Sequence, residues 1–168
     1  MGIISRFKDI MSANINALLD KAEDPEKMID QYLRNLEGDL AKVKQETASV
    51  MAEEAKAKRQ LDECTAEVAK MQSYAEKAVL AGNDEDAKRF LMKKKELVVK
   101  QTSLQETYTL AAENAAKMRQ MHQKLVGDIS QLNSRRDAIK AKIAVAKTQQ
   151  TINKIGASVD GAAESLSA

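Results

Sequence analysis

The chain has 168 residues, no Trp, two Phe, one Pro and six Gly, and 31% of its residues are charged. This composition is typical of long helices rather than of a domain with an aromatic core. The net charge of +2 excludes the strong positive field that attracts nucleic acid. The sequence has no run of 18 or more apolar residues, which is the length that a helix needs to span a bilayer. The single cysteine, Cys64, excludes an internal disulfide and favours a reducing, cytoplasmic setting.

Residues 1–23 predict a short amphipathic helix. At helical spacing, seven apolar side chains share one broad face, which we call the N-terminal face: Ile3, Ile4, Phe7, Ile10, Met11, Ile15 and Leu18. The basic residues Arg6 and Lys8 lie beside it. A face of this kind requires a burial site, and three remain open: a lipid surface, another copy of the chain, or the base of the hairpin predicted by the rest of the sequence.

A long helix is predicted over residues 24–81. Asp24 is a suitable N-cap, and Pro25 suits the first helical position. Apolar positions then repeat every seven residues with a second row offset by four, which predicts a coiled-coil seam. Cys64 lies on this seam as a small buried hydrophobe. The larger seam residues of this helix are Leu36, Val43, Val50, Leu61 and Val68.

A tight turn is predicted at residues 82–84, where Gly82 can adopt the left-handed conformation and Asn83 or Asp84 can cap a new helix. The second helix is predicted over 85–155, with the same sevenfold pattern. Its seam residues are Leu97, Leu104, Met118, Leu125 and Leu132. His122 also falls on the seam, so we expect it to be partly buried.

A turn this short makes the two helices antiparallel, and residues whose numbers add to about 165 should lie side by side. Gly38 and Gly127 then lie at one level, where close backbone approach, a shared flex point or two tolerated surface glycines are open alternatives. The second helix extends past the base of the hairpin over 141–155. The small, polar tail at 156–168 predicts a hinge followed by a frayed helix or by disorder.

Signatures of enzymes and cofactor sites are absent from the sequence. It contains no phosphate-binding glycine loop, no dinucleotide-binding motif and no metalloprotease motif, and one His with one Cys cannot form a transition-metal cluster. We therefore expect a non-enzyme without cofactors or metals. Glu54 and Arg136 interrupt the apolar rows, and we expect both side chains to extend toward solvent.

Two stretches carry a family resemblance: the opening MGIISRFKDI, and ANINALLDKAEDPEKMIDQYL after it. With the long hairpin that follows, they resemble the family of phage shock protein A and the vesicle-inducing protein in plastids. The resemblance implies an ESCRT-III-like membrane-remodelling protein that contacts lipid through the N-terminal face and the neighbouring Arg6 and Lys8. Relatives usually continue with further helices, so we expect a C-terminally shortened version of the family.

The function implied by this resemblance is a peripheral scaffold that maintains or remodels stressed membranes on the inner face of the cell membrane. Its implied partners are anionic phospholipid and further copies of the chain, assembled as a ring, rod or helical polymer. An alternative is a coiled-coil regulator that binds and restrains a transcriptional activator ATPase, although no residue here identifies such a site.

Overall fold

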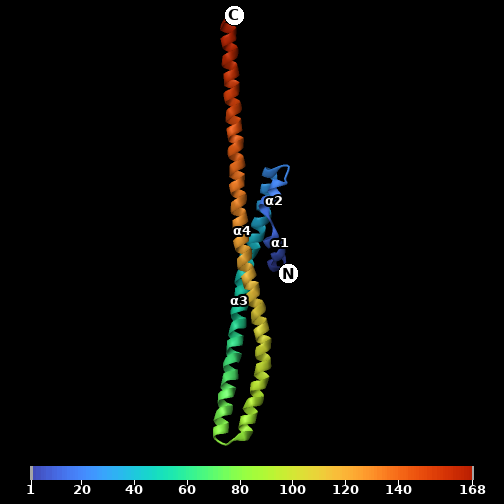
Figure 1. Ribbon diagram of the computed structural model, residues 1–168, viewed down its shortest axis with the longest axis vertical. Helices are drawn as coiled ribbons and strands as arrows, with labels where there is room; N and C mark the ends of the chain where they lie inside the picture. The colour runs from blue at the N-terminus through green and yellow to red at the C-terminus, as the bar shows by residue number, and fades with distance from the viewer. Residues whose placement is uncertain (1, 168) are drawn as a thin grey trace. The chain divides into compact units, whose positions relative to one another are not determined.

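The computed structural model describes residues 2–167, which form an all-helical chain. Two long helices, α3 (Pro25–Leu80) and α4 (Asp84–Ser167), pack antiparallel as a hairpin, and the turn between them is the green loop in Figure 1. Three short elements precede them: the 3-10 helix η1 (Ile3–Arg6), α1 (Phe7–Ser12) and α2 (Ile15–Asp20). The predicted fold class, an all-α chain with a long antiparallel hairpin, is confirmed.

The helix ends follow the capping chemistry expected from the sequence. The Asp24 carboxylate accepts a hydrogen bond from the Lys27 backbone N–H at 3.3 Å, so it caps α3. Gly82 has a φ of +75°, the left-handed conformation that a glycine adopts without strain. Asn83 accepts the Asp86 backbone N–H at 3.1 Å, so it caps α4. These contacts stop one helix and start the next within three residues.

The chain divides into two compact units, each formed by segments far apart in sequence. The first unit comprises residues 2–12 and 39–124, and so contains η1, α1 and the turn end of the hairpin. Its two long helices pair as the short turn predicts, with residue numbers adding to about 165. Contacts between the two helices include Lys94 with Gln72, Gln101 with Thr65, and the Tyr74 and Phe90 rings.

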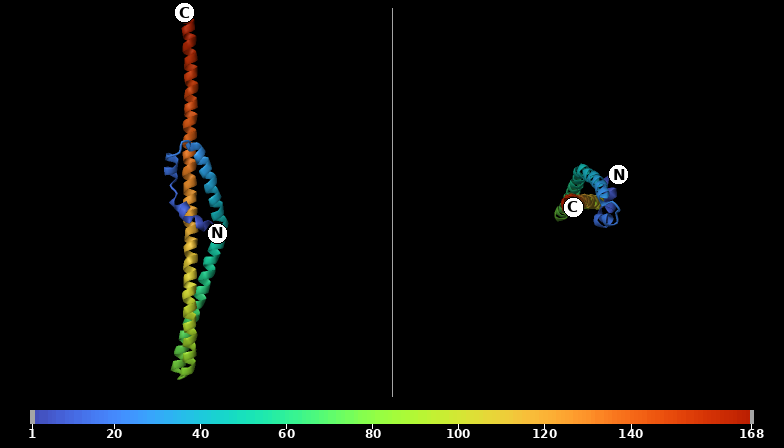
Figure 2. Two further views of the ribbon diagram at one scale, coloured as in Figure 1. Left: turned by 90° about the vertical axis from the view of Figure 1, so that its right-hand side faces the viewer. Right: turned by 90° about the horizontal axis from the view of Figure 1, so that it is seen from above.

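The second unit comprises residues 13–38 and 125–167. Its core contains α2 together with the start of α3 and the middle of α4, in a cluster of fully buried residues: Ile15, Leu19, Ile29, Leu33 and Leu132. Beyond residue 140, every described side chain of α4 is exposed. Figure 2 shows this last part of α4, in orange and red, with no other segment of the unit beside it.

The N-terminal segment differs from the single helix predicted over residues 1–23. It is broken at Ala13 and Asn14, which are not helical. Asn14 has extended backbone angles (φ −114°, ψ 96°), and its side chain accepts the Ala17 backbone N–H at 3.1 Å. Asn is among the strongest N-cap residues, so it starts a new helix here rather than continuing the old one.

One prediction about the glycines was wrong, and one of the open alternatives is excluded. The helix expected to end near residue 155 continues through Gly156 to Ser167, because a glycine costs only about 1 kcal/mol in a helix and no proline follows to stop it. Close backbone approach at Gly38 and Gly127 is excluded, since an added Cβ at either position would meet nothing within 4 Å. A shared flex point and two tolerated surface glycines stay open as alternatives, and both glycines are exposed.

Candidate functional site

In the first unit, the N-terminal face is covered by the protein itself. Ile3 is 2% exposed and Ile10 is 4% exposed. Ile4, Phe7 and Met11 are half-buried, whereas the basic Arg6 and Lys8 are exposed. Residues 2–12 are therefore buried on the hairpin, but against residues 39–46 of α3 and Lys117 of α4 and not at the predicted base near Pro25.

Two polar interactions join this segment to α3, and we call them the latch contacts. The Ile3 backbone N–H donates to Glu46 Oε2 at 2.8 Å, and Arg6 Nη2 donates to Asp39 Oδ2 at 3.0 Å. The side chain of Asp39 is 12% exposed and that of Arg6 is 49% exposed, so this ion pair is open to water on one side. On α4, the Lys117 ammonium lies 5.4 Å from the centre of the Phe7 ring, within cation–π range.

The free energy that holds the segment down is mostly apolar. Full burial of Ile3 and Ile10 contributes about 1.5–3 kcal/mol for each side chain relative to exposure in water. A hydrogen bond to a charged group adds about 1.5–3 kcal/mol, and a half-exposed ion pair adds about 1 kcal/mol or less. Lipid would offer the same side chains a similar apolar gain but no Glu46 or Asp39. The latch contacts are therefore the part of the balance that favours the hairpin over a membrane.

In the second unit, α2 buries a different pair of residues from the predicted one. Ile15 is 4% exposed and Leu19 is 1% exposed, whereas Leu18 is 43% exposed. Because α2 starts anew at its Asn14 cap, its inner face follows the i, i+4 spacing of Ile15 and Leu19. Arg135 on α4 adds an ion pair of 3.4 Å with Asp20.

Sequence reasoning missed the residues that receive the N-terminal segment. Glu46 and Asp39 on α3, and Lys117 on α4, look like ordinary solvated helix positions in a heptad pattern. The buried Asp39, only 9% exposed as a residue, is the clearest exception, and only the fold reveals it. Asn14 carried a readable signal, since an Asn before an apolar run is a typical helix start.

All ten predicted seam residues are at least half-buried in the unit to which they belong. Val43, Met118, Leu125 and Leu132 are fully buried. The other six are half-buried: Leu36, Val50, Leu61, Val68, Leu97 and Leu104. The prediction for His122 was wrong, because it is exposed and its neighbour Met121 is 0% exposed. The sevenfold row of Met118, Leu125 and Leu132 is kept at this level, but the second buried row follows it by three residues, at Met121, and not by four, at His122.

Each of the two polar residues in the apolar rows keeps one side-chain atom buried without a hydrogen-bond partner among the described residues, Arg136 Nε and Glu54 Oε2. Arg136 also reaches two polar partners in the second unit, with Nη2 donating to Asn133 at 2.9 Å and Nη1 at 3.8 Å from Asp30. Neither side chain therefore extends fully toward solvent, contrary to the expectation from the sequence.

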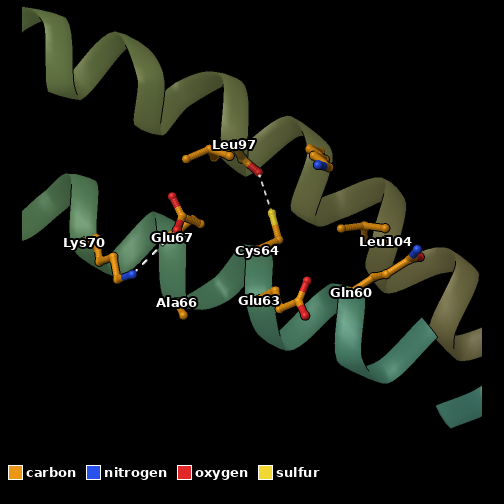
Figure 3. Close-up of a pocket in the computed structure, with 9 residues that line it drawn as sticks. Gln60, Glu63, Cys64, Ala66, Glu67, Lys70, Leu97 and Leu104 are labelled. Atoms are coloured by element: carbon orange, nitrogen blue, oxygen red, sulfur yellow. Dashed lines mark hydrogen bonds and ion pairs between the residues drawn. The ribbon is translucent and has the colours of Figure 1, made fainter. Parts of the chain in front are cut away.

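A groove of about 600 Å³ in the first unit surrounds Cys64, which is 5% exposed and buried as predicted. Its thiol donates to the Leu97 carbonyl at 3.4 Å, so it points from α3 toward α4 (Figure 3). The remaining walls combine charged residues such as Glu63 and Lys70 with aliphatic side chains, as expected for a shallow furrow between paired helices. The groove is therefore explained by the packing of α3 against α4, and the N-terminal segment is the better candidate site.

A family model described as PspA/IM30 matches residues 2–168. The chain belongs to the PspA/IM30 family. Among its relatives in the family, the Phage shock protein A homolog of Bacillus subtilis is 62% identical over 168 residues, which is all of this chain and 74% of the relative. The family resemblance inferred from the opening residues and the hairpin is therefore confirmed.

Some of the more distant family members carry names that refer to membranes. The Membrane-associated protein Vipp1 of Nostoc punctiforme is 28% identical over 152 residues, which cover 90% of this chain and 59% of the relative. Protein LiaH of Bacillus subtilis is 27% identical over 151 residues, covering 90% of this chain and 67% of the relative. The chain thus spans about three fifths of the Vipp1 relative. Within residues 2–167, no helix is both long and apolar enough to cross a bilayer.

Proposed function

We propose that this protein is a peripheral membrane-binding scaffold that maintains or remodels stressed membranes, and that it binds lipid through the N-terminal face. The binding form differs from the form described above, because residues 2–12 must leave the hairpin before Ile3 and Ile10 can reach a bilayer. The names of the Vipp1 relatives support a membrane role for the family.

One observation carries the proposal: the apolar side chains of residues 3–11 are gathered on a short segment that two latch contacts join to α3. The segment is broken from α2 at Ala13 and Asn14, so it can move without unfolding a long helix. Amphipathic helices of this type lie in the bilayer interface, with flanking cations adding attraction to anionic lipid. Arg6 and Lys8 supply those cations.

The same segment therefore has two alternative partners, and the protein can respond to the membrane surface. Anionic headgroups compete with Asp39 for Arg6, and the acyl region competes with the hairpin for Ile3 and Ile10. A ligand shifts such an equilibrium by its difference in affinity for the two forms. Membrane binding thus opens the N-terminal segment, and stronger latch contacts weaken membrane binding.

We also propose that hairpins of this protein pack side by side into a polymer on the membrane. Large apolar side chains exposed near the turn support this assembly, since Leu80 is 88% exposed and Met92 and Val99 are each 68% exposed. Negative-stain electron microscopy of the chain with Leu80→Gln and Met92→Gln checks this: the pair should reduce assembly, and unchanged polymers would contradict the proposal.

Vesicle co-sedimentation tests the membrane proposal. We compare vesicles of phosphatidylglycerol and phosphatidylcholine with vesicles of phosphatidylcholine alone. Ile4→Glu with Phe7→Glu places two charges on the half-buried part of the N-terminal face, and should weaken binding to the anionic vesicles roughly tenfold or more. Ser5→Glu with Ser12→Glu adds the same charges at exposed positions of the segment, and is the matched control.

The control should lose only the few-fold binding expected from its added negative charge. Circular dichroism at matched concentration checks that both double variants retain the helix content of the parent. Equal binding of the parent, the face variant and the control would remove the N-terminal face as the lipid contact.

A further inference from the structure

The last part of α4 carries an apolar surface that nothing in its unit covers. Val145, Ile152, Ile155 and Val159 are 68%, 55%, 60% and 60% exposed, and we call them the C-terminal stripe. At 100° per residue they fall within an arc of about 80° on the helix. Three of them repeat every seven residues, so the alignment is maintained over four turns. Isolated exposed apolar residues are ordinary, but a row at this spacing forms a continuous apolar strip, of the kind that often marks an interaction site.

The charge along this stripe is mainly positive, and Asp160 next to Val159 is the one acidic residue of the sequence between 141 and 162. Between Asp137 and Asp160 the sequence has no acidic residue and four lysines: Lys140, Lys142, Lys147 and Lys154. On the helical projection, Lys142 lies on one side of the stripe, and Lys140 and Lys147 lie on the other. The opposite face is polar and carries Gln150, Asn153 and the fourth lysine, Lys154.

This charge pattern decides what covers the stripe. A second copy of the same segment would bring its own lysines against these, and like charges facing each other oppose such pairing. An anionic bilayer fits both features, because it accepts the apolar row in its interface and attracts the flanking lysines. We propose that residues 141–162 form a second membrane-contacting helix that lies along an anionic lipid surface. This proposal rests on the membrane role proposed above and adds a surface to it.

The C-terminal stripe differs from the N-terminal face in that it is accessible without a conformational change. The stripe residues are exposed already, so they need no release from another part of their unit. The expected dependence on salt is also strong, because each lysine near an anionic surface contributes up to about fivefold in affinity.

The test uses the full chain and a local reporter. With Cys64 replaced by Ala, a cysteine at Ser158, beside the stripe, takes an environment-sensitive nitrobenzoxadiazole label. A second version carries the label at Ser12 instead. Each is titrated with vesicles of phosphatidylglycerol and phosphatidylcholine, and with phosphatidylcholine alone. We expect the label at 158 to shift to the blue and brighten with the anionic vesicles only.

Paired variants connect that signal to the stripe. Ile152→Gln with Val159→Gln should reduce the response at 158 roughly tenfold or more in lipid concentration. Ala146→Gln with Ala157→Gln places the same residues on the opposite, exposed face and should change it less than about threefold. Lys142→Gln with Lys147→Gln should weaken the response more than Lys56→Gln with Lys58→Gln, which removes the same charge from α3.

Two outcomes would overturn the inference. If the label at Ser12 responds to anionic vesicles and the label at 158 does not, the C-terminal contact is wrong while the proposed membrane function stands. If sedimentation without vesicles shows a dimer that the stripe variant abolishes and the control keeps, the stripe binds a second copy instead. If the fluorescence of neither label changes with anionic vesicles, both the proposed membrane function and the C-terminal contact are wrong.

Discussion

The two apolar surfaces proposed to contact lipid differ in how the protein treats them in the absence of a membrane. In the first unit, Ile3 and Ile10 are at most 4% exposed, and the latch contacts hold their segment on α3. In the second unit, each residue of the C-terminal stripe is more than half exposed. The first surface is therefore conditional, since lipid must displace an internal partner, whereas the second is available at once.

This difference suggests a division of labour in membrane binding. An exposed, lysine-flanked stripe favours early and salt-sensitive attraction to an anionic surface. The buried face adds affinity only after the segment opens, so its contribution is reduced by the fraction of molecules still closed. Changes that act on opening should therefore alter binding strongly without touching any lipid-contacting residue.

The largest expected effect is on the stability of the second unit, and it tests whether α2 or the latch contacts control the release of residues 2–12. Leu132 is 0% exposed and belongs to the cluster that buries Ile15 and Leu19. Leu132→Ala should lower the free energy of unfolding of the second unit by about 2–5 kcal/mol, because it leaves a cavity there. Urea unfolding followed by helix content measures this, with the 45% exposed Val126→Ala as a control expected to stay within about 0.5 kcal/mol.

Vesicle affinity should respond less to Leu132→Ala than to loss of the latch contacts, which lie in the other unit. A larger gain in affinity from Leu132→Ala than from the latch variant described next would show that α2, and not the latch, controls release.

The next effect is opening of the segment itself. Asp39→Ala with Glu46→Ala removes both latch acceptors and should favour the open form by about 2 kcal/mol, which is about thirtyfold in affinity for anionic vesicles. The matched control, Asp62→Ala with Glu53→Ala, removes the same charges from exposed positions of α3. It should raise affinity only by the small amount due to net charge. An equal increase in vesicle affinity in the two double variants would show that the change in net charge, and not loss of the latch contacts, causes the effect.

Much of this arrangement could be read from the sequence, and the reasons are local. The helix ends are marked by the backbone and side-chain chemistry of Asp24, Pro25, Gly82 and Asn83. The sequence therefore predicts the hairpin and the pairing of residues whose numbers add to about 165. Asn14 signals a helix start in the same terms, but the apolar spacing of Met11, Ile15 and Leu18 continues across it and predicts one unbroken helix.

The partners of the N-terminal segment could not be found this way. Glu46, Asp39 and Lys117 are polar residues on long helices, and their spacing relative to residues 2–12 depends on how the segment folds back. The burial of Met121 instead of His122 has a similar cause, because the facing helix determines whether the second buried row follows Met118 by three residues or by four. Local rules gave the elements, and packing between distant segments determined the site.

The smallest expected effect concerns Gly2. An added Cβ there would lie 1.8 Å from Glu46 Oε1, so the carboxylate must move and its bond to the Ile3 N–H should weaken. Gly2→Ala should therefore raise vesicle affinity about two- to fivefold, for a loss of about 0.5–1 kcal/mol. The effect should vanish when Glu46 is already Ala, which a double-mutant cycle measures. Gly38→Ala, where an added Cβ meets nothing, is the control, and a persistent effect without Glu46 would contradict this explanation.

The central claim is that the N-terminal face exchanges the hairpin for lipid, and the absence of Trp from the chain allows a direct measurement of it. Phe7→Trp introduces one indole at the half-buried position beside Lys117. On anionic vesicles containing lipids brominated along their acyl chains, the account predicts a blue-shifted emission that is strongly quenched. Co-sedimentation of the protein with an unquenched, unshifted indole would show that residue 7 stays on the hairpin, and would contradict the account.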